Sequence, residues 1–158
     1  MSDEHVHDST EATLAHSRRV GDLMREIITE LAGRSVKHDL SKTLAPEKAY
    51  FDEYTPKLRA TTYGSPEYAA SLQALKPALD HHYANNPHHP EHYGDDGING
   101  MTLADLVEML ADWKASGERH AYGSLARSLQ IQQQRFAIDE QLMRILQNTA
   151  RHFGWLDE

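Results

Sequence analysis

The clearest helical pattern in the sequence is TLAHSRRVGDLMREIITEL, residues 13–31. Its apolar residues recur every three or four positions and form one stripe of an α-helix: Val20, Leu23, Ile27 and Leu31. His16 lies four residues before Val20, so its imidazole falls on the same inward stripe. The pattern predicts a helix from about Ser9 to Leu31, with Gly33 as its C-terminal stop.

Further helices are predicted along the rest of the chain. One short helix carries residues 36–42, and Pro46 begins another over residues 46–60. Ser65-Pro66-Glu67 is a strong helix start, and Thr102-x-x-Asp105 is a capping-box pattern that begins a further helix. These signals predict a predominantly helical chain.

Two regions depart from this regularity. Residues 85–100, NNPHHPEHYGDDGING, are rich in Pro, Gly and Asn and are expected to form an ordered loop with little regular structure. The last third carries two apolar stripes that differ in phase, which indicates two helices with a break near Ala137. No alternating run is convincing as a strand. We therefore predict an all-α fold, a single compact bundle of six or seven helices.

The composition fits one globular domain. The chain has 158 residues, of which 39% are apolar and 25% charged. We predict a flexible tail over residues 1–8 and a single helical domain over residues 9–158. No apolar run approaches the roughly 20 residues that span a bilayer, and the first ten residues are polar and acidic. A cytoplasmic location without a membrane partner is expected.

Charge and residue usage narrow the function classes. A net charge of −8 opposes binding to a nucleic acid polymer, whereas a free nucleotide fits because a bound cation can invert the local field. The absence of cysteine excludes disulfides, thiolate zinc sites and cysteine nucleophiles. Eleven histidines stand out, and five of them lie in one short stretch: His81, His82, His88, His89 and His92.

The segment VKHDLSK contains the adjacent pair His38-Asp39. An imidazole and a carboxylate on one turn can reach a single divalent ion. Such a pair is common at solvated helix starts, so its context matters. The pattern H-x-x-R-V precedes it at residues 16–20, and H-D-x-S-K continues it to Lys42.

This order of motifs resembles the start of the HD-domain superfamily. Its members bind metal in a helical bundle through a His, an adjacent His-Asp pair and a distant Asp, and they often have glycine where this chain has Ser41. The segments HDLSK, HHYANNPHHPEHY and DLVEMLADW also look like a family of uncharacterised bacterial and phage proteins, whose role the resemblance does not supply.

The resemblance implies His16, His38, Asp39 and Asp112 as metal ligands. Asp112 is preferred to Glu108 because it lies in L-A-D-W-K, within an apolar helix, like the last aspartate of HD proteins. The alternative for His16 is a core histidine hydrogen-bonded to a carbonyl. For Asp112 it is a residue that faces water.

The histidine cluster could extend the site to two metals, as in HD proteins with additional histidines before the final Asp. His82 continues the buried face of its helix, and His89 would arrive from the loop. The remaining candidate ligands are His81, His88, His92 and Glu108. The alternative is a histidine-rich surface loop with no ligand role.

A ligand set of imidazoles and carboxylates suits one or two ions of Mn, Fe, Co, Ni or Zn. The preferred function is a metal-dependent phosphohydrolase, in which water activated by the ion attacks phosphorus. The resemblance implies a nucleotide or another small phosphate ester as substrate. Asp39 and Lys42 are the candidate catalytic residues, and Lys42 would neutralise phosphate charge. Arg19 and Asn86 are candidate substrate contacts, with surface solvation as their alternative.

Two other functions stay open. Some HD proteins hold two irons and activate dioxygen to cleave a C–C or C–P bond, and the extra histidines would serve that chemistry. A non-catalytic module that binds a nucleotide or partner and keeps its metal for structure is the third interpretation. The apolar stripes of the last third could serve a homodimer as well as a core.

Overall fold

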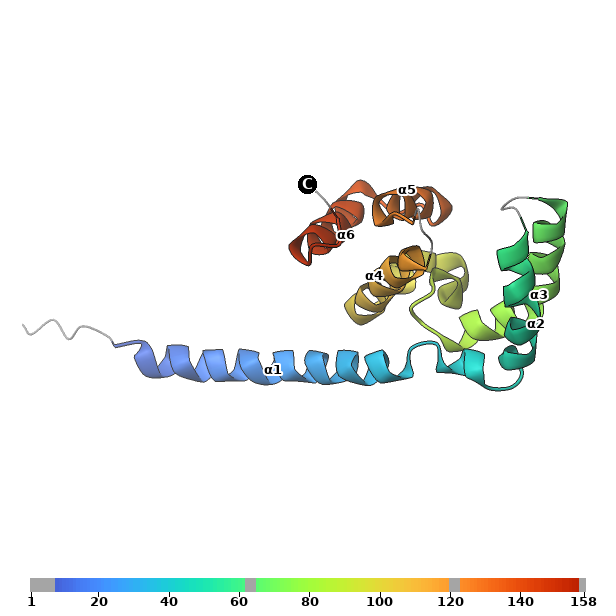
Figure 1. Ribbon diagram of the computed structural model, residues 1–158. Coiled ribbons are helices and arrows are strands. Elements are labelled where there is room, and N and C mark those ends of the chain that lie inside the picture. Colours follow the sequence, from blue (N-terminus) through green and yellow to red (C-terminus); the bar gives the residue numbers. More distant parts are fainter. Residues whose placement is uncertain (1–7, 62–64, 120–122, 157–158) are drawn as a thin grey trace, which may run out of the picture. The chain divides into compact units, whose positions relative to one another are not determined.

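The computed structural model describes residues 8–61, 65–119 and 123–156. These residues form six α-helices and two 3-10 helices, with no strand among them, which confirms the predicted all-α class (Figure 1). The six α-helices agree with the predicted six or seven helices. The elements are α1 (Thr10–Lys37), η1 (Leu40–Thr43), α2 (Glu47–Ala60), α3 (Pro66–Asn85), η2 (Pro90–Gly100), α4 (Leu103–Glu118), α5 (Leu125–Arg135) and α6 (Glu140–His152). Of the predicted tail, only Asp8 belongs to the described residues.

The chain divides into two compact units at Val36 and Lys37. The first unit contains α1 up to Val36, and the second holds every other element. The predicted stop at Gly33 is wrong, because α1 continues to Lys37. Side-chain contacts bridge the glycine: Arg34 Nε donates to Glu30 Oε1 at 2.8 Å, and Ser35 Oγ donates to the Ala32 carbonyl. A glycine inside a helix costs only about 1 kcal/mol, which such contacts and the backbone ladder offset.

Two helix starts lie where the cap residues predict them. The Ser65 hydroxyl accepts the backbone N–H of Tyr68 at 3.1 Å and so begins α3. At α4 the capping box is complete, because Thr102 Oγ1 accepts from Asp105 N at 3.2 Å and Asp105 Oδ2 accepts from Thr102 N at 2.7 Å. These local hydrogen bonds satisfy donors that the first turn leaves free.

In the second unit, α2 and α3 lie side by side and η1 packs against both (Figure 1). An apolar core forms between α4, α5 and α6. Its buried members are Met109, Leu110, Trp113, Leu125, Leu129, Ile138, Met143, Leu146 and Ala150. The predicted break between the last two helices is confirmed: Ala137 has a positive φ of 49°, which turns the chain between α5 and α6.

The region 85–100 is more regular than the sequence predicts. Pro90–Gly100 forms the 3-10 helix η2, interrupted at Gly94 (φ 57°) and Gly97 (φ 48°). Glycine adopts positive φ readily, so short helical turns can follow one another here with sharp changes of direction. Among the described residues, no helix has the length and apolar character needed to cross a membrane.

Two apolar residues of α5 differ in burial because only one of them faces the core. Leu129 is 1% exposed and Ile131 is 52% exposed. Leu129→Ala should lower the free energy of unfolding by about 2–5 kcal/mol, because it leaves a cavity in the core. Ile131→Ala should change it by less than about 0.5 kcal/mol. Urea denaturation monitored by circular dichroism measures both, and equal losses would contradict the assignment of the core.

Candidate metal centre

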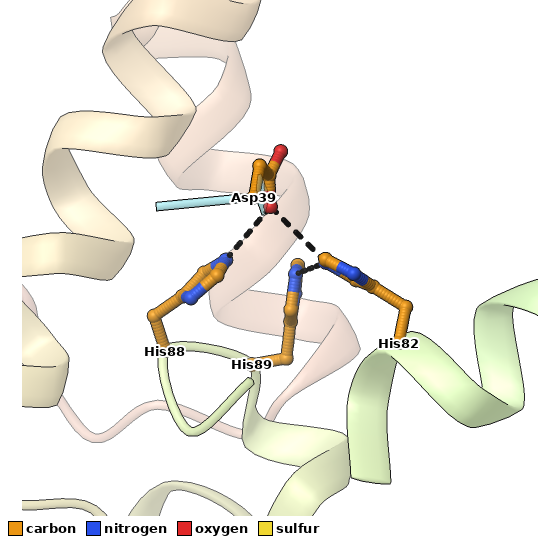
Figure 2. A group of neighbouring side chains, drawn as sticks. All are labelled: Asp39, His82, His88 and His89. Carbon is orange, nitrogen blue, oxygen red and sulfur yellow. Dashed lines mark hydrogen bonds and ion pairs between the residues drawn. The ribbon is translucent and has the colours of Figure 1, made fainter. Parts of the chain in front are cut away.

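A cluster of imidazoles and carboxylates lies inside the second unit. Four segments supply it: the turn after α1, the end of α3, the connection into η2, and α4. The side chains are His38, Asp39, His82, His88, His89, Glu108 and Asp112. Figure 2 shows four of them converging, with Asp39 above the rings of His82, His88 and His89.

Asp39 reaches this cluster through an unusual backbone conformation. The predicted helix over residues 36–42 is wrong: α1 ends at Lys37, residues 38–39 form a turn, and η1 follows. Asp39 is left-handed, with φ 58° and ψ 9°. Aspartate tolerates this region better than most residues, although such a conformation still costs about 1–3 kcal/mol. Backbone strain of this kind is typical of functional sites.

The two carboxylate oxygens of Asp39 have different surroundings. Oδ2 accepts from Lys42 Nζ at 2.6 Å. Oδ1 lies 3.2 Å from His82 Nε2 and 3.6 Å from His88 Nε2. Burial raises the pKa of Asp39, but the facing His82 and the Lys42 ammonium outweigh it and hold the pKa well below its usual value. Asp39 is therefore an anion directed at the histidines.

A first group of donor atoms comes from Asp39, His82, His88 and His89. One donor atom from each lies within 4.8 Å of the others, and the Nε2 atoms of His82 and His89 are 3.0 Å apart. Ligand atoms about 2.0–2.2 Å from an ion stand roughly 3–3.5 Å from one another. The donor atoms of this group are therefore close enough together to hold a metal ion.

Two atoms of the first group support this interpretation. Asp39 Oδ1 and His88 Nε2 are buried and have no hydrogen-bond partner in the described part of the chain. A buried polar atom without a partner costs about 1–3 kcal/mol. The two atoms face each other across 3.6 Å, and an ion bound between them would satisfy both. The residues therefore fit a metal.

A second group comes from His38, His88 and Asp112, which also lie within 4.8 Å of one another. His38 Nε2 is 3.6 Å from Asp112 Oδ1 and 3.7 Å from Asp39 Oδ2. The interaction with Asp112, helped by Glu108, raises the pKa of His38 to about 9 despite partial burial. The two groups share His88, and the Asp39 carboxylate of the first group lies next to His38 of the second.

Glu108 contacts the Nδ1 side of two imidazole rings, those of His38 and His88. Its Oε1 is 2.9 Å from His38 Nδ1 and 3.2 Å from His88 Nδ1. An ionised carboxylate only accepts hydrogen bonds, so it favours N–H at both Nδ1 atoms and directs both Nε2 atoms toward the donor groups. The structure thus places Asp112 within a donor group and Glu108 as a partner of the rings.

The imidazoles of the first group are suited to binding a cation. Burial lowers the pKa of His88, and burial together with neighbouring imidazoles lowers the pKa of His89 to about 3. Both rings are therefore held neutral at pH 7. Neutral imidazole is the form that binds metal.

Two of the candidate histidines in the second unit lie outside both groups. His81 directs Nδ1 at Glu47 Oε1, 2.7 Å away, and its side chain is 42% exposed. His92 is exposed and donates from Nδ1 to the Tyr83 carbonyl at 2.9 Å. His81 points away from His82 because adjacent residues on a helix are separated by about 100°.

The predicted substrate contacts have different positions. The Asn86 amide donates to the His82 carbonyl at 2.7 Å and to Ser41 Oγ at 3.1 Å, so it helps to hold His82 and Ser41 in place. Lys42 lies beside Asp39 and is partly exposed. His16 and Arg19 belong to α1 in the first unit. Their roles as ligand and substrate contact stay predictions.

Sequence reasoning missed Glu47. Its side chain is completely buried and contacts His81, His82 and Ser41. Burial raises its pKa, but hydrogen bonds from these three residues outweigh it, and the pKa lies below its usual value. In the sequence, Glu47 follows Pro46 at a helix start, where an exposed acidic residue is the ordinary expectation.

The shared position of His88 gives a direct prediction. His88→Gln should lower metal affinity by at least about tenfold, because the amide cannot replace the ring nitrogen in either donor group. Metal per chain after equilibrium dialysis, measured by elemental analysis, checks this. His152→Gln is the matched control, since His152 is exposed at the end of α6. An unchanged metal content in the His88 variant would contradict the assignment.

Both donor groups lie within the part of the chain that matches a known protein family. Residues 5–152 match the model of a family of unknown function, DUF5662. No curated protein and no solved structure matches the chain. The match covers nearly the whole sequence, and the chain therefore belongs to the DUF5662 family.

Proposed function

We propose that the protein is a metal-dependent phosphohydrolase that acts on a nucleotide or another small phosphate ester. The observation that carries the proposal is the pair of unpartnered buried atoms, Asp39 Oδ1 and His88 Nε2, inside a group of further nitrogen donors. The resemblance of the motif order to HD-domain proteins supports the same reaction class.

The two donor groups would hold one or two ions. The nitrogen and oxygen set is compatible with Mn, Fe, Co, Ni or Zn, and availability rather than affinity selects among them. His16 is proposed as an additional ligand on the basis of the resemblance. A bound ion supplies an activated water at neutral pH and polarises a phosphoryl oxygen.

The chain's own residues prepare the site for an anionic substrate. Lys42 Nζ donates to Asp39 Oδ2, and its side chain is 31% exposed. An ammonium has three N–H donors, so two remain to bind a phosphate oxygen while the bond to Asp39 persists. Glu108 holds the rings of His38 and His88, so that their Nε2 atoms need not reorient when substrate binds.

The charge of the chain favours a small substrate. With a net charge of −8, the surface would repel a nucleic acid polymer over many phosphates, whereas a single phosphate group interacts mainly with local cations. Arg19 remains a proposed substrate contact. Asn86 is the weaker candidate, because its amide N–H groups already bond to Ser41 and His82.

One observation favours a second candidate function. His38, His88 and Asp112 form a set of two imidazoles and one carboxylate, which is the ligand pattern of many non-haem iron oxygenases. The alternative is therefore an iron-dependent oxygenase that cleaves a C–C or C–P bond with dioxygen. The two chemistries differ in the metal that supports turnover and in whether oxygen is consumed.

The test is phosphate release by protein loaded separately with each of the five metals. The substrates are p-nitrophenyl phosphate and a panel of nucleoside mono- and triphosphates. We expect metal-dependent release, reduced by at least about 100-fold in Asp39→Asn, because this change removes a charged ligand. Asparagine also tolerates the left-handed conformation, so the fold should persist.

Asp80→Asn is the control for this experiment. Asp80 is exposed and pairs with Lys76 on the surface of α3, so the substitution should leave turnover unchanged. Oxygen consumption by the iron-loaded protein without phosphate release would overturn the hydrolase in favour of the oxygenase. Tight metal binding with neither activity would indicate a non-catalytic module.

A further inference from the structure

We propose that Glu47 is a positioning residue that keeps the proton of His82 on Nδ1 and so directs the Nε2 lone pair of His82 into the first donor group. The inference rests on the proposed metal site and adds a residue that no sequence motif indicates. Glu47 comes from the start of α2, whereas His82 lies near the end of α3.

The carboxylate of Glu47 is buried and contacts protein side chains rather than solvent. Its side chain is 0% exposed. Oε2 lies 3.0 Å from His82 Nδ1 and accepts from Ser41 Oγ at 3.0 Å, while Oε1 lies 2.7 Å from His81 Nδ1. Each oxygen of the carboxylate is therefore used as an acceptor. A buried carboxylate that is fully used in this way has a fixed orientation.

This orientation determines the tautomer of His82. A neutral imidazole has one N–H, and the partner of one ring nitrogen sets which nitrogen carries it. With the proton on Nδ1 facing Glu47, the lone pair of Nε2 faces Asp39 Oδ1 at 3.2 Å and His89 Nε2 at 3.0 Å. In the other tautomer, Nε2–H would donate to Asp39 Oδ1 and leave the Nδ1 lone pair against the Glu47 carboxylate. With the proton on Nδ1, the two acceptor atoms repel each other, and a cation bound between them would remove that repulsion. Glu47 thus prepares His82 as a ligand.

Ser41 and Asn86 extend the same arrangement. Ser41 Oγ and Asn86 Nδ2 also lie 3.0 Å and 3.1 Å from His82 Nδ1. The Asn86 amide, however, uses its two N–H groups on the His82 carbonyl and on Ser41 Oγ, and the Ser41 hydroxyl donates to Glu47 Oε2. The hydrogen bonds therefore run in one direction and end on the carboxylate. This gives a physical reason for Ser41, at the position where the HD-domain motif often has glycine: the hydroxyl is a donor to Glu47.

Nuclear magnetic resonance of the metal-free wild-type protein tests the tautomer directly. Nitrogen-15 shifts of the imidazole rings distinguish N–H at Nδ1 from N–H at Nε2, and the spectrum of His82→Gln identifies the His82 signals. We expect the proton on Nδ1. A proton on Nε2 would overturn the proposal, and this readout holds whether or not the protein has activity.

Metal affinity tests the consequence. Glu47→Leu removes both acceptor oxygens and should weaken cobalt binding by about 10–100-fold in a calorimetric titration. Glu47→Gln should recover most of the affinity, because its carbonyl can still accept from His82 while the exposed His81 changes tautomer. Glu53→Leu, at an exposed site on the same helix, is the control and should bind like wild type. Wild-type affinity in Glu47→Leu would overturn the proposal.

The two proposals fail in different ways. If the wild-type protein binds no cobalt, the metal-dependent function falls, and the tautomer of His82 still decides the role of Glu47. If Glu47→Leu does not fold, the comparison of Glu47→Gln with wild type replaces it. Retention of the Nδ1 proton of His82 with near-wild-type affinity, or loss of that proton together with weaker binding, supports the proposal, and a change in only one of the two overturns it.

Discussion

Two polar atoms without a hydrogen-bond partner among the described residues, Asp39 Oδ1 and His88 Nε2, are buried 3.6 Å apart in the second unit. Asp39 Oδ1 also lies 3.2 Å from His82 Nε2, which in turn lies 3.0 Å from His89 Nε2. The other polar atoms of these side chains have partners: Lys42 donates to Asp39 Oδ2, and Glu47 and Glu108 contact Nδ1 of His82 and of His88. A cation bound between these atoms would satisfy them, and a metal site would explain why several polar side chains are buried in one place.

Much of the fold could be predicted because helix starts are local. Ser65 and Thr102 cap the helices that follow them with hydrogen bonds to residues three positions away, so sequence spacing was sufficient. The end of α1 was not predictable from Gly33, because side chains on either side of it continue the helix. The conformation of Asp39 also escaped prediction, since a left-handed residue between two helical segments has no spacing signal.

The site was predictable where it depends on motif order and unpredictable where it depends on packing. His38, Asp39 and Asp112 were proposed from the motif order, His82 from its position on a helix face and His89 from the histidine-rich loop, and all five belong to the two donor groups. His88 was only one of several further candidates and belongs to both groups, because the direction of a loop side chain cannot be derived from spacing. Glu47 was missed because its contact with His82 exists only once α2 lies against α3. Membership of DUF5662 leaves the reaction to be argued from this geometry.

The central claim is that these donor atoms enclose a metal ion. Anomalous diffraction at the absorption edge of the metal, from crystals grown with manganese or cobalt, tests it most directly. We expect a peak about 2.0–2.2 Å from the Asp39 carboxylate and from Nε2 of His82 or His88. A map at saturating metal without a peak, in which the imidazoles bond directly to the carboxylates, would contradict the account.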